Sequence, residues 1–195
     1  MKHLRLSLLL ILCTFMFTCD EEDLLDFLED PEIDVTTNFA FLIDISSPML
    51  SNPDERVSFT SGILAYDIIS NPEIAERIGE PERIKGVRIN TVTYEFKNFS
   101  GNVDADVSGF LAFPGPVGGE GDIRYDMQEV KVAEADLFGN VYTLNGNFGA
   151  VNERASELKG IGCVYTGDSS HNPVDFTLEV IVNATITLEI NIDDL

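Results

Sequence analysis

The stretch VDFTLEVIVNATITLEINI, residues 174–192, gives the clearest structural signal in the chain. Every even position from Val174 to Ile192 is apolar, and the odd positions are mostly polar. Successive side chains of a β-strand point to opposite faces, so this period of two predicts a half-buried strand. At about 3.3 Å per residue the strand would span roughly 60 Å, which is longer than most strands. We therefore expect it to bend or to cross between two sheets, with Asn183-Ala184 as the weakest point.

Apolar residues recur with the same period in several other segments. In residues 86–99 the apolar phase changes near Asn90-Thr91, which predicts either a β-bulge or a strand that passes from one sheet to the other. Phe138 to Val141 is expected to form a hairpin. The further expected strands are NFAFLIDI (38–45), ERVSFTSGILAYDI (55–68, broken at Gly62), GVRINTVTYEFKNF (86–99), GFLAF (109–113), DIRYDMQEVKVAEADLF (122–138) and NVYTLNG (140–146).

Two short segments have helical rather than strand character. NPEIAERIGE (71–80) begins with an Asn71 cap and Pro72, and it ends at Gly79. AVNERASELKG (150–160) ends at Gly160 and places three apolar residues on one face: Val151, Ala155 and Leu158.

These elements predict an all-β fold. Many strands separated by Gly, Pro and Asn turns indicate a two-layer antiparallel β-sandwich with one or two short connecting helices. We assign the sandwich to residues 36–195, and PGPVGGEG (114–121) is expected to be a surface loop within it.

The composition is strongly acidic. The chain has 12 Lys and Arg against 34 Asp and Glu, a net charge of −22. Removal of Lys2 and Arg5 with a signal peptide leaves 10 against 34, or −24. Phosphate binding needs cationic side chains, so nucleic acids and anionic membrane surfaces are excluded as partners. The charge fits a cationic partner or divalent cations, and it fits equally well an acidic surface that only confers solubility.

The N-terminus has the features of an export signal. Lys2, His3 and Arg5 form a basic region, and Leu6 to Phe17 is an almost wholly apolar run of 12 residues. This run is too short to span a bilayer, which needs about 20 apolar residues, but it suits the apolar core of a signal peptide. Thr18-Cys19 follows it directly.

This region resembles the signal of bacterial lipoproteins. The resemblance implies a signal peptide over residues 1–18, a lipid on Cys19 and an acidic tether over residues 19–35. The acidic run after the cysteine is similar to the surface-export signal of Bacteroidota-type lipoproteins, which implies a lipid-anchored protein of the outer membrane, displayed at the cell surface. A secreted protein and an uncleaved N-terminal anchor are the alternatives. The residues of the run are Asp20, Glu21, Glu22 and Asp23.

The cysteines do not suggest catalysis. Cys13 lies in the apolar run and would leave with the signal, so Cys163 is the sole thiol besides Cys19 in the mature chain. Cys163 lies in a strand-like pattern and is expected to be buried and inert. A nucleophilic cysteine would need a histidine partner, and the mature chain offers His171 alone.

Two clusters of polar residues are candidate sites. Asn102, Asp104 and Asp106 alternate, but Val107 occupies the position where an EF-hand loop requires glycine. The sequence therefore favours the polar face of an edge strand over a metal site, with Val103, Ala105 and Val107 behind it. The second cluster is expected to form a turn and no catalytic relay; its residues are Asp168, Ser169, Ser170 and His171.

No catalytic residue is assigned, and no metal or cofactor is expected. One histidine and one cysteine are too few for a typical zinc site, and no glycine-rich phosphate loop follows a strand. We expect a non-enzymatic protein-binding or accessory module. The alternative is a module that binds carbohydrate or calcium, or, with less support, a carboxylate-based hydrolase. Exposed tyrosines or carboxylates converging in a concave pocket would favour that alternative.

Overall fold

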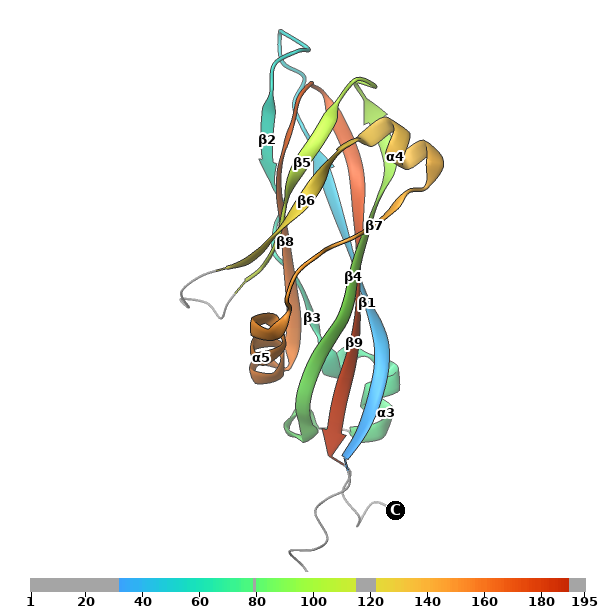
Figure 1. The fold of residues 1–195 in the computed structure, drawn as a ribbon, viewed down its shortest axis with the longest axis vertical. Helices are drawn as coiled ribbons and strands as arrows, with labels where there is room; N and C mark the ends of the chain where they lie inside the picture. Colours follow the sequence, from blue (N-terminus) through green and yellow to red (C-terminus); the bar gives the residue numbers. More distant parts are fainter. Residues whose placement is uncertain (1–31, 79, 115–121, 190–195) are drawn as a thin grey trace, which may run out of the picture.

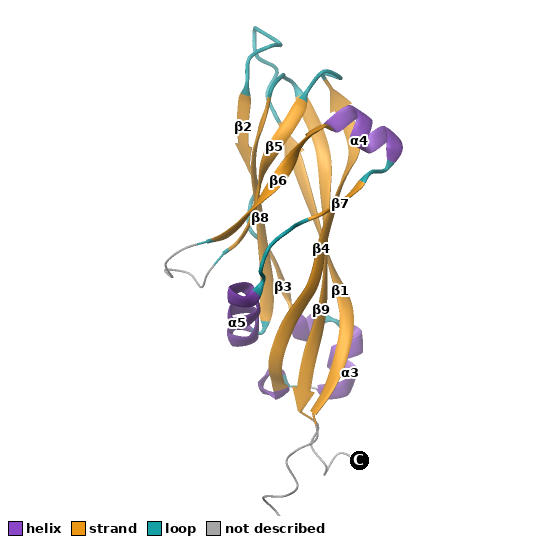
Figure 2. Ribbon diagram, viewed as in Figure 1, coloured by secondary structure: helices purple, strands orange, loops and turns teal. Residues whose placement is uncertain are grey.

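The fold consists of two antiparallel sheets packed face to face (Figures 1 and 2). The computed structural model describes residues 32–78, 80–114 and 122–189. The first sheet has the strand order β1-β9-β4-β7, and the second has the order β2-β8-β5-β6, with β3 also paired to β8. The strands are β1 (Glu32–Ser46), β2 (Val57–Thr60), β3 (Leu64–Asp67), β4 (Ile84–Gly101), β5 (Asp106–Phe113), β6 (Ile123–Lys131), β7 (Val141–Thr143), β8 (Gly160–Ser169) and β9 (Val174–Glu189).

The predicted all-β sandwich is confirmed, and its arrangement is that of a jelly roll. Short helices connect the strands. They are α3 (Pro72–Ile78), α4 (Val132–Phe138) and α5 (Gly149–Leu158), with single 3-10 turns η1 (Ile68–Ser70) and η2 (Pro81–Arg83). The chain enters β1 four residues before the expected domain boundary, so Glu32–Val35 are part of the sheet.

The predicted C-terminal strand is present as β9, and its even positions face the core. Of the two expectations for this strand, the crossing between two sheets near Asn183-Ala184 is wrong. β9 pairs with β1 without a register shift from Asp175 to Glu189, so it stays in one sheet. The strand can be this long because it lies between β1 and β4, which satisfy its backbone on both sides.

The phase change in β4 is a bulge, one of the two predicted explanations. The register with β9 shifts between Ile89 and Thr91, which leaves Asn90 as the additional residue. An extra residue turns the following side chains to the other face. Val87 and Ile89 are therefore buried together with the even positions that follow Thr91.

The strand expected over residues 122–138 is wrong in its second half. β6 ends at Lys131, and Val132–Phe138 forms α4. Val132 and Ala135 are buried one turn apart, and Gly139 ends the helix with φ 60°. The run VAEADLF is rich in helix formers, and glycine adopts this left-handed conformation without a steric penalty.

Both predicted helices are confirmed. In α3 the Asn71 side chain accepts a hydrogen bond from the Glu73 amide at 2.9 Å. In α5 Val151 and Ala155 are buried, whereas Leu158, on the same face at the end of the helix, is 49% exposed. The helix ends on Lys159, which takes the left-handed conformation with φ 52° where Gly160 was expected to terminate it.

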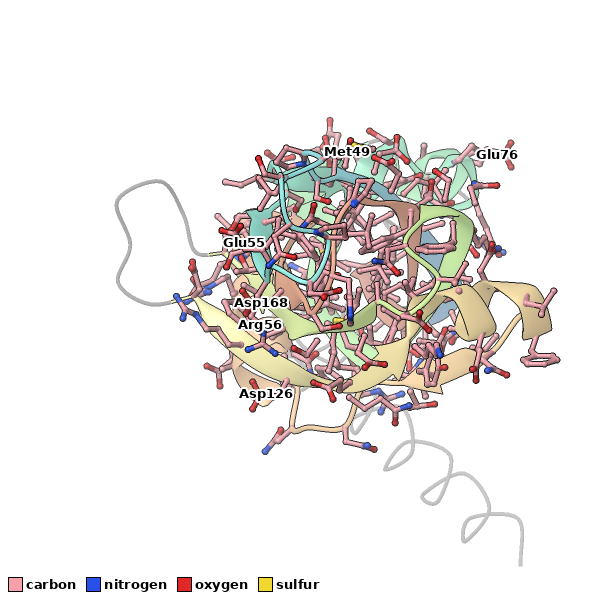
Figure 3. All side chains as sticks on the ribbon, turned by 90° about the horizontal axis from the view of Figure 1, so that it is seen from above. Met49, Glu55, Arg56, Glu76, Asp126 and Asp168 are labelled. Atoms are coloured by element: carbon pink, nitrogen blue, oxygen red, sulfur yellow. The ribbon has the colours of Figure 1, made fainter. Side chains whose placement is uncertain are left out.

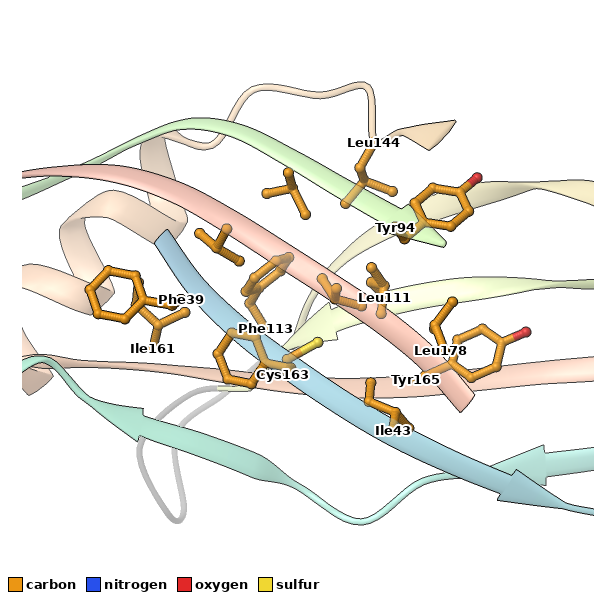
Figure 4. Packing of buried hydrophobic residues seen from close by; sticks show 14 of the residues in the cluster. Phe39, Ile43, Tyr94, Leu111, Phe113, Leu144, Ile161, Cys163, Tyr165 and Leu178 are labelled. Atoms are coloured by element: carbon orange, nitrogen blue, oxygen red, sulfur yellow. The ribbon is translucent and has the colours of Figure 1, made fainter. Parts of the chain in front are cut away.

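The core lies between the sheets and is rich in aromatic rings (Figure 4). Phe39 meets Tyr66 edge-on with ring centroids 5.0 Å apart, which links β1 to β3. Tyr94 stacks on Tyr142 with ring centroids 5.3 Å apart, which links β4 to the edge strand β7. The first pair therefore connects the two sheets, and the second pair joins neighbouring strands of the first sheet.

The outer face of the first sheet carries polar side chains hydrogen-bonded across strands. Asn90 donates its amide to Asn183 at 2.9 Å, and Asn183 donates in turn to Asn38 at 2.8 Å. Thr177 donates to Asp44, and Thr187 donates to Asp34, both at 2.8 Å. These bonds hold the two β1 carboxylates on the solvent face of the sheet.

Candidate functional site

An apolar groove lies on the outer side of the second sheet, next to the end of α5. Its cavity volume is about 340 Å³, near the lower end of the range for ligand pockets. Figure 1 shows the segments around it, with β3 and the start of β8 on one side and α5 on the other. The lining residues are Ile63, Ala65, Tyr66, Asp67, Pro114, Leu158, Lys159, Gly160, Ile161 and Gly162.

The groove exists because two outward positions of β8 have no side chain. Along β8 the odd residues point into the core, so Gly160 and Gly162 face outward. They pair with Asp67 and Ala65 of β3, respectively. The floor of the groove therefore consists of the glycine backbone and the methyl group of Ala65. A Cβ atom added to Gly162 would lie 3.3 Å from Cγ of Pro114, so any larger side chain here would enter the groove.

The walls are formed by large apolar side chains that remain in contact with solvent. Ile63 is 67% exposed and Leu158 is 49% exposed. Neither is needed to fill the core, and both face a hollow that is otherwise apolar. Burial of a Leu or Ile side chain by a partner contributes about 1.5–3 kcal/mol, so this surface favours association with another apolar group.

The charged residues of the groove are fixed by the fold. The left-handed backbone of Lys159 turns its ammonium group toward the Ile84 carbonyl, to which Nζ donates a hydrogen bond. Asp67 accepts a hydrogen bond from the Ile69 amide at 3.2 Å and thereby caps η1. The lining residues include no histidine, serine or cysteine, and the groove offers mainly apolar contact.

The Asp168–His171 segment forms no Ser–His–Asp relay. Asp168 lies on the outer face of β8, where Ser58 of β2 donates a hydrogen bond to it (Figure 3). Ser170 Oγ lies 2.8 Å from Nδ1 of His171 and accepts a hydrogen bond from the Asp106 amide at 2.9 Å. The carboxylate next to the ring is that of Asp54, 3.7 Å from Nε2.

Ser169 and Asn172 have structural roles at the same turn. Ser169 is buried and donates a hydrogen bond to the His171 carbonyl at 2.7 Å. Asn172 is also fully buried, and it accepts a hydrogen bond from the Leu50 amide at 2.7 Å. Its Nδ2 group donates to the carbonyls of Asn52 and Glu55, both at 2.9 Å. This one side chain holds the loop between β1 and β2, a role that the sequence pattern did not reveal.

The expected edge strand at Asn102–Val107 is wrong in its first part. Residues 102–105 form a turn in which Asn102 accepts a hydrogen bond from the Asp104 amide at 3.0 Å, and β5 begins at Asp106. Val103 is exposed rather than packed behind the strand. Asp104 also lies 3.4 Å from the Lys131 ammonium. Within the described ranges, no three His, Cys, Asp or Glu side chains come together as metal ligands.

Cys163 is buried, as predicted. It lies on the core side of β8, directly after the outward Gly162, and burial raises the pKa of its thiol to about 12. A thiol held neutral in this way is a poor nucleophile at neutral pH.

The tyrosines form no exposed platform. Tyr94, Tyr125 and Tyr165 are buried, and Tyr66 and Tyr142 are half-buried against the core, which accounts for all five tyrosines of the chain. Burial raises the pKa of Tyr94, Tyr125 and Tyr165. The arrangement that would favour carbohydrate binding is therefore not present on these residues.

The predicted lipidation site Cys19 and the export signal Asp20–Asp23 lie outside the described residues. In the part of the chain that the structure describes, no helix is long and apolar enough to cross a membrane.

Neither a protein-family model nor a curated protein matches this sequence. Several solved structures of viral proteins are similar in fold. The BFDV capsid protein in a decameric crystal structure is 11% identical, with a TM-score of 0.36 over 80% of this chain and 98% of that one. The mud crab tombus-like virus structure is 8% identical, with a TM-score of 0.41 over 86% of each chain. Desmodium yellow mottle tymovirus gives 9% identity and a TM-score of 0.36 over 84% of this chain and 86% of that one. These likenesses concern the jelly-roll sandwich and carry no conclusion about activity.

Proposed function

We propose that the chain is a lipid-anchored, non-enzymatic protein-binding module at the cell surface, and that the groove beside α5 receives an apolar side chain of its protein partner. The observation that carries the proposal is the glycine floor between two exposed apolar walls. Apolar anchors that fill a preformed hollow supply most of the energy of many protein interfaces.

The expected partner segment is apolar at its anchor and basic around it. Asp67 lies in the groove, and the outward residues Glu153 and Glu157 lie on α5 next to it. The net charge of −22 acts over a longer range and favours encounter with a cationic protein. Complementary charges chiefly raise the association rate, while the buried anchor determines how long the complex lasts.

A photo-crosslinking amino acid at Leu158 tests the groove in intact cells. We expect a discrete adduct with a protein, and we expect Gly162→Val to abolish it because the valine side chain occupies the floor. Thr166→Val is the matched control, since residue 166 also faces outward on β8 but lies beyond the groove. An adduct that survives Gly162→Val, or the absence of any protein adduct, would contradict the proposed site.

Metabolic labelling with a palmitate analogue tests the anchor separately. We expect incorporation that is lost in Cys19→Ala, because the thiol of residue 19 would carry the lipid. Cys163→Ala is the control and should remain labelled, since that thiol is buried. Labelling that persists without Cys19 would remove the lipoprotein assignment but would leave the groove proposal intact.

A further inference from the structure

β1 differs from the other edge strands of the sandwich. It is 15 residues long, and its register with β9 is unbroken. The other edges are short or irregular: β7 has three residues, β2 and β3 have four each, and the register between β5 and the nine-residue β6 is shifted. Proteins normally blunt their edge strands by shortening, bulges or proline, because an open edge pairs with other strands. None of these devices interrupts β1.

The direction of the free backbone groups of β1 follows from one hydrogen bond. The Ser47 amide donates to the Val174 carbonyl at 2.9 Å, so the even residues of β9 turn their backbone groups toward β1. In an antiparallel pair these residues face odd residues of β1, such as Ile43 opposite Leu178. The even residues of β1 therefore direct both N–H and C=O away from the sheet.

The part of this edge from Asn38 to Asp44 is open. Among the described residues, no hydrogen bond reaches the outward backbone groups of Asn38, Ala40, Leu42 or Asp44. Leu42 is 59% exposed, although it lies in the middle of the strand. Nearer the start of the strand, Asn71 donates a hydrogen bond to the Thr37 hydroxyl at 3.0 Å. The segment before α3 therefore contacts β1 at Thr37 through a side chain, and it leaves the backbone from Asn38 onward uncovered.

The charges of β1 select what can pair with it. The strand contains Glu32, Asp34 and Asp44 and no basic residue. Thr187 and Thr177 hold the two aspartates on the same face, about 33 Å apart for ten residues of strand. Full-length pairing of two copies, centred on Phe39, would place each Asp34 opposite an Asp44. Like charges opposite each other are destabilising, so this pattern opposes self-pairing and favours a cationic strand.

We propose that the open edge of β1 accepts an extended segment of another protein, which adds a strand to the first sheet and places basic residues opposite Asp34 and Asp44. Backbone hydrogen bonds from the outward residues would hold the segment, as in other cases of strand addition, and the aspartates would set its register and its charge. This surface is separate from the groove, and it goes beyond the function proposed for the groove.

The test uses the full chain and the capped peptide KVTVTVTVTVK, whose lysines are ten positions apart on one face. We expect the peptide to slow hydrogen exchange at the amides of Ala40, Leu42 and Asp44, measured residue by residue by NMR. A peptide with glutamate in place of both lysines is the matched probe, and it should give no protection. Charge reversal with Asp34→Lys and Asp44→Lys should weaken the binding of the lysine peptide by about tenfold. This is the effect expected from the loss of two exposed charge pairs of about 0.7 kcal/mol each.

Leu42→Pro tests the backbone directly. Proline at an outward position removes an unpaired N–H and leaves the hydrogen bonds to β9 intact, so the fold should persist while binding is lost. Leu42→Thr keeps the N–H and should bind normally. Thermal unfolding of both variants verifies the fold; if Leu42→Pro is unfolded, the charge-reversal variant decides the question.

Three outcomes would overturn the inference. The first is no protection of the outward amides by the lysine peptide. The second is equal binding of the glutamate peptide, which would show an edge without charge selection. The third is concentration-dependent dimerisation that Leu42→Pro abolishes, which would assign the edge to a second copy of the chain. Gly162→Val should bind the peptide as the unmodified chain does, so failure of the groove proposal and failure of this one are distinguishable.

Discussion

Single residues decide where this molecule can and cannot react. The glycines at 160 and 162 open a groove on one side of β8, while Cys163, the next residue along the strand, places a buried thiol on the other side. The same strand thus presents bare backbone to solvent and a neutral sulfur to the core. Sequence alternation identified the inward position of Cys163. It could not identify the groove, whose walls come from Ile63, Pro114 and Leu158, because only the folded chain brings these residues together.

The buried thiol of Cys163 makes the folded state less stable at alkaline pH. Burial raises the pKa of Cys163 from 9.0 to about 12, so the folded state keeps a proton that the unfolded state loses above about pH 9. Stability contributed by this group is present below pH 9 and is lost between pH 9 and 12, by about 1.4 kcal/mol per pH unit. Buried Tyr94 and Tyr165 add a loss of the same sign at higher pH, because burial also raises their pKa values.

We therefore expect the free energy of unfolding, measured with urea, to fall from pH 9 to pH 11. Cys163→Ala is less stable at neutral pH because it leaves a cavity, but its free energy should fall less steeply over this range. The slope, not the absolute stability, is the readout. Identical slopes for the two chains would show that the thiol ionises in the folded state.

At the scale of elements, the local sequence pattern predicts some strands and helices, and others depend on tertiary context. The alternation of β9 and the phase change at Asn90 were sufficient to predict a long strand and a bulge. α4 was missed because Val130 and Val132 share an even-numbered apolar phase, while Val132 and Ala135 also fit one helical turn. The expected crossing of β9 between the two sheets was wrong because a strand with neighbours on both sides can exceed the usual length. The sequence does not state how many neighbours a strand has.

The end of α4 gives a prediction at this scale. Gly139 has φ 60°, and a Cβ atom there would find adequate space, 3.7 Å from the Glu95 carboxylate. We expect Gly139→Ala to lower the free energy of unfolding by about 1 kcal/mol, because the left-handed conformation is strained for alanine. Gly62→Ala is the matched control, since a Cβ there meets nothing within 4 Å and no positive φ applies. Equal effects of the two changes on urea denaturation would show that backbone strain is not the cause.

For the whole molecule, charge is the dominant property. A net charge of −22 implies mutual repulsion between carboxylates across the surface, where labelled acids such as Glu55, Glu76 and Asp126 lie at the periphery (Figure 3). Local pairs such as Lys97 with Glu179, 2.6 Å apart, offset little of it. Composition alone revealed this excess and is the basis for expecting no nucleic acid partner. It could not distinguish a solubilising surface from a binding surface, because that distinction depends on which edges and hollows remain uncovered.

We expect the melting temperature to rise by several degrees as NaCl increases from about 20 mM to about 0.5 M, because salt screens repulsion between exposed charges. A combined Glu153→Gln and Glu157→Gln variant removes two exposed charges from α5 and should show a smaller rise. Sucrose, which is uncharged, is the control for general solute effects on stability. A melting temperature that falls with salt would mean that ion pairs outweigh the repulsion.

The side-by-side position of the first and last strands determines when the chain can fold. Thr36 of β1 bonds Thr185 of β9 across 149 residues of sequence, and β4 also depends on β9 for most of its length. The first sheet therefore cannot assemble until the final strand has left the ribosome, and contacts of such long range form slowly. A chain emerging from synthesis would stay extended during this interval. This delay is compatible with the export proposed above, in which the chain would cross a membrane before it folds.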